Sequence, residues 1–282
     1  MNSSGRPSLP LFYFENSNID IPAEVLHRCL LEFAEWGDLA RLAAVQTSWS
    51  HIMYEAASSD PLAAWSLAQA LLHGTDGLSS NPHAAMKLLR TLSGLEEDEC
   101  QMPLRRNAIL NEFSAAAMKE IATYYLPNNP TAGLAWLEAA YEVGNNLDAA
   151  HEVALVYENG SHGIEVDVVG AVAWFEKAAE GGHVEAMAEL GLCYELGLAV
   201  EQSDEKALEW YMKAAEKGHL TAKYSIGEAF EEARGVPQSD AEACLWYYRA
   251  AIDGDEDSRR ALRRLEDIAR IVLPGVGRLL DE

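Results

Sequence analysis

Apolar and polar positions alternate with a helical period along most of the chain, and one such pattern returns three times in its second half. The stretches WFEKAAEGGH from Trp174, WYMKAAEKGH from Trp210 and WYYRAAIDGD from Trp246 start 36 residues apart. An aromatic residue, an Ala-Ala pair and a glycine follow one another at steps that place large and small side chains on one helical stripe. The glycine after the last turn suits a left-handed C-cap. Each stretch therefore predicts one amphipathic helix with its stop signal.

A second helical pattern precedes each of these helices. A small residue stands at the centre of its apolar stripe in every copy, as Ala154, Gly191 and Gly227. Because a glycine inside a helix costs ~1 kcal/mol relative to alanine, we expect another backbone to pack closely there. In the links, Ser203 or Asp204 can cap one following helix, and Ser239 with Glu242 forms a capping box for another. The repeating unit is thus a pair of helices.

Weaker copies of the same columns extend upstream through residues 117–144 and 63–94, which gives about five helical pairs. This pattern resembles the Sel-one-like repeat, a relative of the tetratricopeptide repeat with a longer, glycine-bearing link. The resemblance covers about residues 60–255. It implies an all-α, curved solenoid of stacked helix pairs with a concave surface that binds other proteins.

The array is interrupted near residues 95–112 and ends at residues 255–282. The acidic interruption predicts an extra helix or a hinge. The C-terminal segment predicts a capping helix that covers the last open face of the solenoid. Its apolar residues at helical spacing are Ala261, Leu262, Leu265, Ile268 and Ile271. We expect its arginines to form a solvated face that pairs with neighbouring acids.

Residues 19–57 match no column of the array and predict two short helices, the first opened by Pro22 and the second capped by Asp38. The stretch resembles an F-box, with Glu24, Cys29 and Asp38 among the matching positions. The resemblance implies binding to the Skp adaptor of Skp–cullin–F-box ubiquitin ligases. The residues expected to contact the adaptor are Ile21, Pro22, Val25, Leu26, Leu30, Phe33, Leu39, Val45 and Trp49.

This stretch departs from the usual F-box in a few places. Ile21 replaces the leading leucine, Phe33 replaces a leucine, and no basic pair precedes Trp49. These changes mostly preserve hydrophobic volume, so they bear more on affinity than on the family. The alternative is that residues 21–57 form a helical cap over the first repeat.

Charge and cysteine content narrow the classes of partner. The formal net charge of -24 and the pI near 4.6 disfavour binding to nucleic acid or to an acidic membrane surface. The first 18 residues, expected to be a flexible tail, contain no apolar run typical of a signal peptide, so we expect the cytoplasm or nucleus. The four cysteines lie far apart and predict free thiols: Cys29, Cys100, Cys193 and Cys244.

Motifs for catalysis were sought and none was found, so we expect a non-catalytic protein without cofactor or metal. His183 and His219 recur with the repeat, which indicates a capping or packing role, and the Trp and Tyr columns indicate core. An enzyme with its site in the groove is the least favoured alternative. Residues of the first helices that lie off the packing stripe are the candidates for the substrate groove: Glu152, Val156, Glu189, Cys193 and Ser225.

The sequence therefore predicts a substrate-recognition subunit with residues 58–254 as the solenoid. In this hypothesis the N-terminal unit binds the Skp adaptor and through it a cullin. The solenoid holds a protein substrate, for which a basic segment would complement the acidic charge. The alternative is a protein-interaction scaffold of the Sel-one-like type with no role in ubiquitin transfer.

Overall fold

The computed structural model describes residues 61–74, 80–97, 101–104, 113–273 and 276. The predicted F-box-like unit, including all nine residues from Ile21 to Trp49 expected to contact the adaptor, lies outside these ranges. The described chain divides between Leu88 and Leu89 into two compact units.

The described part of the chain is built almost entirely of α-helices, which confirms the predicted all-α class. The first unit contains α3 (Pro61–His73) and the start of α4 (Pro82–Ser93). The helices of the second unit follow as α5 (Ser114–Tyr125), α6 (Pro130–Glu142), α7 (Leu147–Asn159), α8 (Val168–Gly181), α9 (Val184–Leu196), α10 (Asp204–Glu216), α11 (Leu220–Glu232), α12 (Asp240–Ile252), α13 (Glu256–Arg264) and α14 (Glu266–Val272). A single 3-10 turn, η1 (Ser161–Gly163), lies between α7 and α8.

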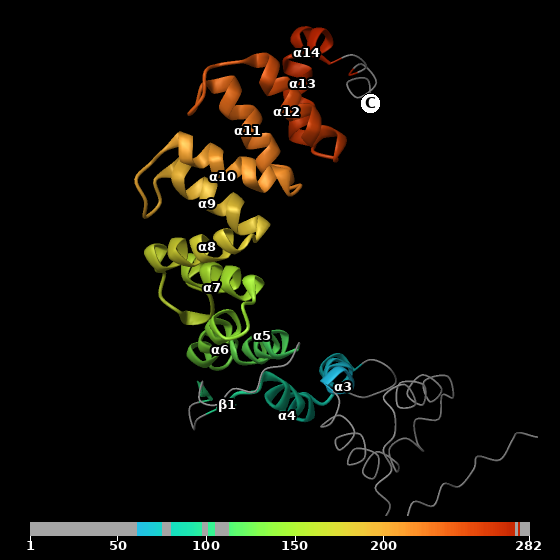
Figure 1. Cartoon of the computed structure of the whole chain (residues 1–282), viewed down its shortest axis with the longest axis vertical. Helices are drawn as coiled ribbons and strands as arrows, with labels where there is room; N and C mark the ends of the chain where they lie inside the picture. Colours follow the sequence, from blue (N-terminus) through green and yellow to red (C-terminus); the bar gives the residue numbers. More distant parts are fainter. Residues whose placement is uncertain (1–60, 75–79, 98–100, 105–112, 274–275, 277–282) are drawn as a thin grey trace, which may run out of the picture. The chain divides into compact units, whose positions relative to one another are not determined.

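In the second unit the helices succeed one another in sequence order along the array (Figure 1). Each helix from α6 to α11 packs on the helix before it and on the helix after it. Four pairs result, and we call α5, α7, α9 and α11 the first helices and α6, α8, α10 and α12 the second helices. Contacts that stay between sequence neighbours are typical of a solenoid, in which each repeat is stabilised by the next.

Polar residues cap the N-termini of most of these helices. The residue before each of them accepts a hydrogen bond from a backbone N–H of the first turn, in the series Asn129, Asn146, Asp167, His183, Ser203, His219, Ser239 and Asp255. These bonds satisfy amides that have no partner inside the helix. The predicted caps are confirmed for Ser203 and Ser239, whereas Asp204 is the first helical residue.

The small residue at the centre of each first helix makes room for an aromatic ring. A Cβ atom at Gly191 would lie 2.7 Å from the ring of Tyr211, and one at Gly227 would lie 2.5 Å from the ring of Tyr247. Both tyrosines are buried on the second helix of the same pair. The expectation of a closely packed backbone was therefore wrong for these two glycines, because the neighbour is a side chain.

The tryptophan column is only partly core. Trp174 is 8% exposed, but Trp210 and Trp246 are half-buried. The cationic group of the residue three positions later lies over each tryptophan ring. Lys177 Nζ is 3.6 Å from the Trp174 ring centroid, and Lys213 Nζ is 3.6 Å from that of Trp210. The fully packed aromatic column is the next residue along the chain, in the series Phe175, Tyr211 and Tyr247.

Among the described residues of the interruption, 95–97 and 101–104 contain a short hairpin. The extra helix or hinge stays a prediction, because residues 98–100 and 105–112 lie outside the described ranges. Strand β1 (Glu96–Glu97) pairs antiparallel with β2 (Pro103–Leu104). The hairpin is fixed to α6, since Trp136 Nε1 donates a hydrogen bond of 2.9 Å to the Gln101 carbonyl oxygen. Asn129, the N-cap of α6, donates from Nδ2 to Gln101 Oε1 at 3.0 Å.

The C-terminal cap is confirmed, but it consists of two helices. Residues of α13 and α14 such as Leu262 and Ala269 are buried in one cluster with Tyr247 of α12. The helix breaks at Leu265, which leaves the α conformation with ψ 26. This break shifts the register, so Ala269 is buried and Ile271, expected on the apolar stripe, is 81% exposed. The predicted pairing of arginines with acids is confirmed at three positions: Arg259–Glu256, Arg260–Asp257 and Arg264–Glu231.

Candidate interaction surface

The first helix of one pair contacts the first helix of the next pair. His151 of α7 stacks on His183, the N-cap of α9, with ring centroids 4.5 Å apart. Arg234, just after α11, forms an ion pair with Glu195 of α9. These contacts bring side chains of successive first helices together, so the first helices share one continuous surface.

All five predicted groove residues lie on the first helices. They are Glu152 and Val156 on α7, Glu189 and Cys193 on α9, and Ser225 on α11. Glu152, Glu189 and Ser225 are half-buried at equivalent positions, and Glu152 forms an ion pair with Lys119 of α5 at 3.6 Å. Val156 and Cys193 are each 4% exposed. Their side chains therefore belong to the interior, because they follow a buried residue of the packing stripe by one turn.

The surroundings of Cys193 are acidic. Burial first, and then the charges of Glu158, Glu189 and Glu176, together raise the pKa of its thiol to about 11. Burial and the charge of Glu158 also raise the pKa of Glu189. A thiol with a raised pKa stays protonated at neutral pH, which lowers its reactivity as a nucleophile. Cys193 and Cys244 are free and buried, as predicted.

The recurring histidines are N-caps. Nδ1 of His183 accepts a hydrogen bond of 3.2 Å from the backbone N–H of Ala186, and Nδ1 of His219 accepts one of 3.1 Å from that of Ala222. A capping role is confirmed, but the expected partner was wrong: the rings cap the start of the following helix and not the terminal carbonyls of the preceding one. A ring nitrogen can accept only when it is unprotonated, so both caps require neutral Nδ1 atoms.

The junction between α7 and α9 is built from two stacked imidazoles. Burial first, and then the nearby His183, lower the pKa of His151 to about 4 against the opposing charges of Glu185 and Asp148. His183 Nε2 lies 3.4 Å from Asp148 Oδ1. The stacked rings thus hold two repeats together without a net positive charge on His151 at neutral pH.

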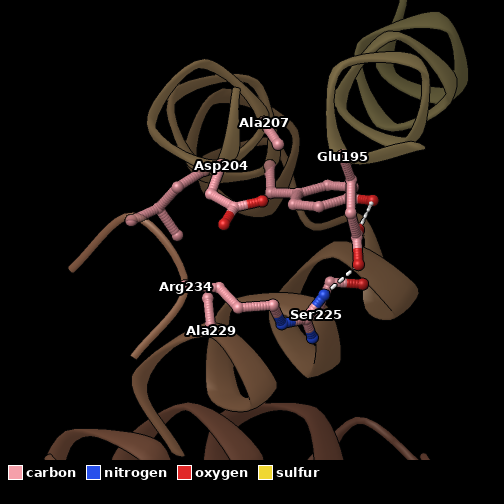
Figure 2. Close-up of a pocket in the computed structure, with 8 residues that line it drawn as sticks. Glu195, Asp204, Ala207, Ser225, Ala229 and Arg234 are labelled. Atoms are coloured by element: carbon pink, nitrogen blue, oxygen red, sulfur yellow. Dashed lines mark hydrogen bonds and ion pairs between the residues drawn. The ribbon is translucent and has the colours of Figure 1, made fainter. Parts of the chain in front are cut away.

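The junction between α9 and α11 is ionic and surrounds a small pocket (Figure 2). Arg234 and Glu195 face each other across it and form an ion pair, and the Tyr211 hydroxyl donates to Glu195 Oε2 at 2.7 Å. Ser225 lines the pocket as well. The free volume is about 10 Å³. A single water molecule needs about that much room.

The same arrangement recurs one repeat later. The Tyr247 hydroxyl donates to Glu231 Oε2 at 2.8 Å, and Arg264 of α13 lies 2.6 Å from the same carboxylate oxygen. Sequence reasoning missed this Tyr–Glu–Arg motif. Its signal was the constant spacing of 16 residues between the glutamate and the tyrosine in both copies.

Within the described ranges, no group of three or more His, Cys, Asp or Glu side chains is arranged to hold a metal ion. None of the helices described there is long and apolar enough to span a lipid bilayer.

Comparison with protein families gives five matches along the chain. The model described as Sel1 repeat matches residues 61–92, 116–145, 147–183, 184–219 and 221–255. The chain belongs to the Sel1 repeat family. Each Sel1 repeat coincides with one helix pair, from α3 with α4 to α11 with α12. The family has a protein-interaction scaffold fold. The matched segments start at residue 61, so the F-box resemblance stays a prediction.

Solved structures share the fold. A Sel1 repeat protein from Oxalobacter formigenes aligns with 84% of this chain and 92% of its own, at 21% identity and a TM-score of 0.60. The protein c5321, a protective antigen of uropathogenic Escherichia coli with an SLR fold, aligns over 93% of this chain at 19% identity and a TM-score of 0.65. The match spans 55% of c5321. Comparison with curated proteins gave no match.

Proposed function

We propose that this Sel1 repeat chain is a non-catalytic scaffold that holds a protein partner on the surface of its first helices. The observation that carries the proposal is the continuous surface that α7, α9 and α11 form through contacts between repeats. Half-buried acids, including Glu189 of α9 and Glu158 of α7, lie on this surface. A basic segment of a protein partner would complement them.

Site-specific cross-linking tests this proposal in the full chain. A photoreactive residue at position 189, on a first helix, should give adducts with a partner protein, and raised salt should reduce them because the attraction is electrostatic. The matched control is position 180, an exposed residue of the second helix α8. Equal adducts from both positions, or none from position 189, would remove the first helices as the binding surface.

A finer proposal concerns the N-terminal residues 21–49. We propose that they form an F-box that binds the Skp adaptor and through it a cullin, so that the solenoid presents a substrate for ubiquitin transfer in the cytoplasm or nucleus. The F-box resemblance supports this. The solenoid would act by position alone, because joining two binding modules raises the effective concentration of substrate near the ligase.

Titration with purified Skp adaptor tests the ligase role. The wild-type chain should bind, and L26D with L30D should abolish binding while I252D, on α12, should not. Absence of binding by the wild type would leave the plain scaffold. Equal binding by L26D/L30D in a folded protein would exclude the predicted contact surface.

A further inference from the structure

Three exposed leucines lie on α9 and in the link that follows it. Leu192 is 39% exposed, Leu196 is 58% exposed and Leu198 is 38% exposed. Leu192 and Leu196 stand one helical turn apart, so they share a face of α9. We call these three residues the leucine patch. Exposed aliphatic side chains that gather in one place are typical of interaction sites.

The equivalent residues of the next repeat show how side chains at these three positions lie relative to one another. Glu228, Glu232 and Arg234 follow the three leucines by 36 residues. There the Arg234 side chain contacts both acids, with Nη2 3.5 Å from Glu228 Oε2 and Nε 3.1 Å from Glu232 Oε2. Residues at these positions thus contact one another in the repeat formed by α11 and α12.

The backbone of the two links is the same, so this comparison holds for the leucines. The N–H of Leu198 bonds to the Cys193 carbonyl at 2.9 Å, and that of Arg234 bonds to the Ala229 carbonyl at 2.9 Å. The residue before each is left-handed, with φ 68 at Gly197 and φ 59 at Ala233. The three leucines therefore stand at positions whose equivalents in the next repeat lie close together.

Uncompensated acids border the leucine patch. Glu189 precedes Leu192 by three residues on α9, and Glu158 of α7 and Glu176 of α8 act with it on Cys193. Of the cations in the described ranges, none forms an ion pair with any of these three acids. In the following junction Glu195, the equivalent of Glu158, is neutralised by Arg234. Here a leucine stands in place of that arginine.

We propose that the leucine patch and its bordering acids form a docking site for a segment of a partner protein that carries aliphatic side chains beside Lys or Arg. This inference rests on the proposed scaffold function and states the chemistry of the partner. The leucines would bury the aliphatic side chains, and the cations would neutralise Glu158 and Glu189. A second copy of the chain fits poorly, because each copy carries a net charge of -24.

Selection from a random-sequence peptide display library on the full chain tests the docking site. Enriched peptides should combine aliphatic residues with Lys or Arg. Synthesised as free peptides, they should lose affinity at least ~10-fold for L192D/L196D. The matched control is I252D, because Ile252 is 56% exposed and ends α12 as Leu196 ends α9. Thermal melts should show that both variants are folded.

Three results would overturn the inference. One is enrichment of acidic or purely apolar peptides. Another is equal binding of basic, aliphatic peptides by wild type and L192D/L196D. The third is self-association in sedimentation that L192D/L196D abolishes, which would make a second copy the occupant. Binding that survives these substitutions but is lost by other changes on the first helices would reject the docking site and leave the scaffold function intact.

Discussion

Two junctions of the same solenoid differ in chemistry although their backbones agree. Between α7 and α9 the contact is an imidazole stack, and the nearby Glu158 lacks an ion-pair partner among the described residues. Between α9 and α11, Arg234 forms ion pairs that include Glu195, and Tyr211 bonds to the same acid. The helix pairs therefore provide a constant frame, while the side chains that face the junctions are free to vary and to create binding chemistry.

The frame is where the largest stability effects are expected. Tyr247, fully buried on α12, fills the space that Gly227 leaves open, and Tyr211 does the same against Gly191. Replacing either tyrosine by alanine should lower the free energy of unfolding by about 3–5 kcal/mol, since it removes a large buried ring and leaves a cavity. Urea unfolding measures this loss. A large loss of stability for Tyr247→Ala with none for Tyr211→Ala would show that the two helix pairs are not packed in the same way.

Adding a methyl group at the central glycine should have a smaller effect. Gly227→Ala places a Cβ 2.5 Å from the Tyr247 ring and should cost about 1–3 kcal/mol through overpacking. In a Tyr247→Leu background the ring is gone, so the same change should cost less, because alanine favours the helix by ~1 kcal/mol over glycine. A double-mutant cycle measures the coupling. Equal costs in both backgrounds would show that the ring does not require the glycine.

Exchanging the side chains that distinguish the two junctions should change the free energy of unfolding by about 1 kcal/mol. Arg234→Leu removes the ion pairs with Glu195 and Glu228 and brings uncompensated acids together, so stability should fall by that amount. Added salt should reduce the loss because it screens the acids. The reciprocal Leu198→Arg should stabilise the chain slightly by pairing with Glu158. Urea unfolding at low and high salt checks both, and a salt-independent loss would contradict the ionic reading.

The sequence predicted the frame much better than the junctions. The 36-residue period, the Ala-Ala pairs and the glycines indicate helix pairs directly, because these features follow from local packing and capping. The sequence did not show which of Trp246 and Tyr247 is buried. The two adjacent residues both border the apolar stripe, and only the packing of the neighbouring helix decides between them. As a candidate groove residue, sequence reasoning chose Cys193, whose side chain is buried, instead of Leu192, whose side chain is exposed. Apolar residues on a helix look alike until the packing partner is known.

The smallest expected effect is a pH dependence confined to the imidazole junction. The pKa of His151 is lowered to about 4, chiefly by burial and then by His183, while Glu185 and Asp148 act in the opposite direction and Lys119 in the same one. A histidine whose pKa is lower when folded contributes stability above its ordinary pKa, and this contribution is lost as pH falls from about 6.5 toward 4.

Between about pH 7 and pH 5, the wild type should lose about 1 kcal/mol more stability than His151→Gln, a modest figure because solvent screens the partly exposed ring. Urea unfolding of both proteins at each pH measures the difference. Titratable groups distant from His151 are the same in both proteins, so their contributions cancel. Parallel losses would show that His151 is solvated at the junction, and the contrast between a neutral and an ionic junction would then rest on Arg234 alone.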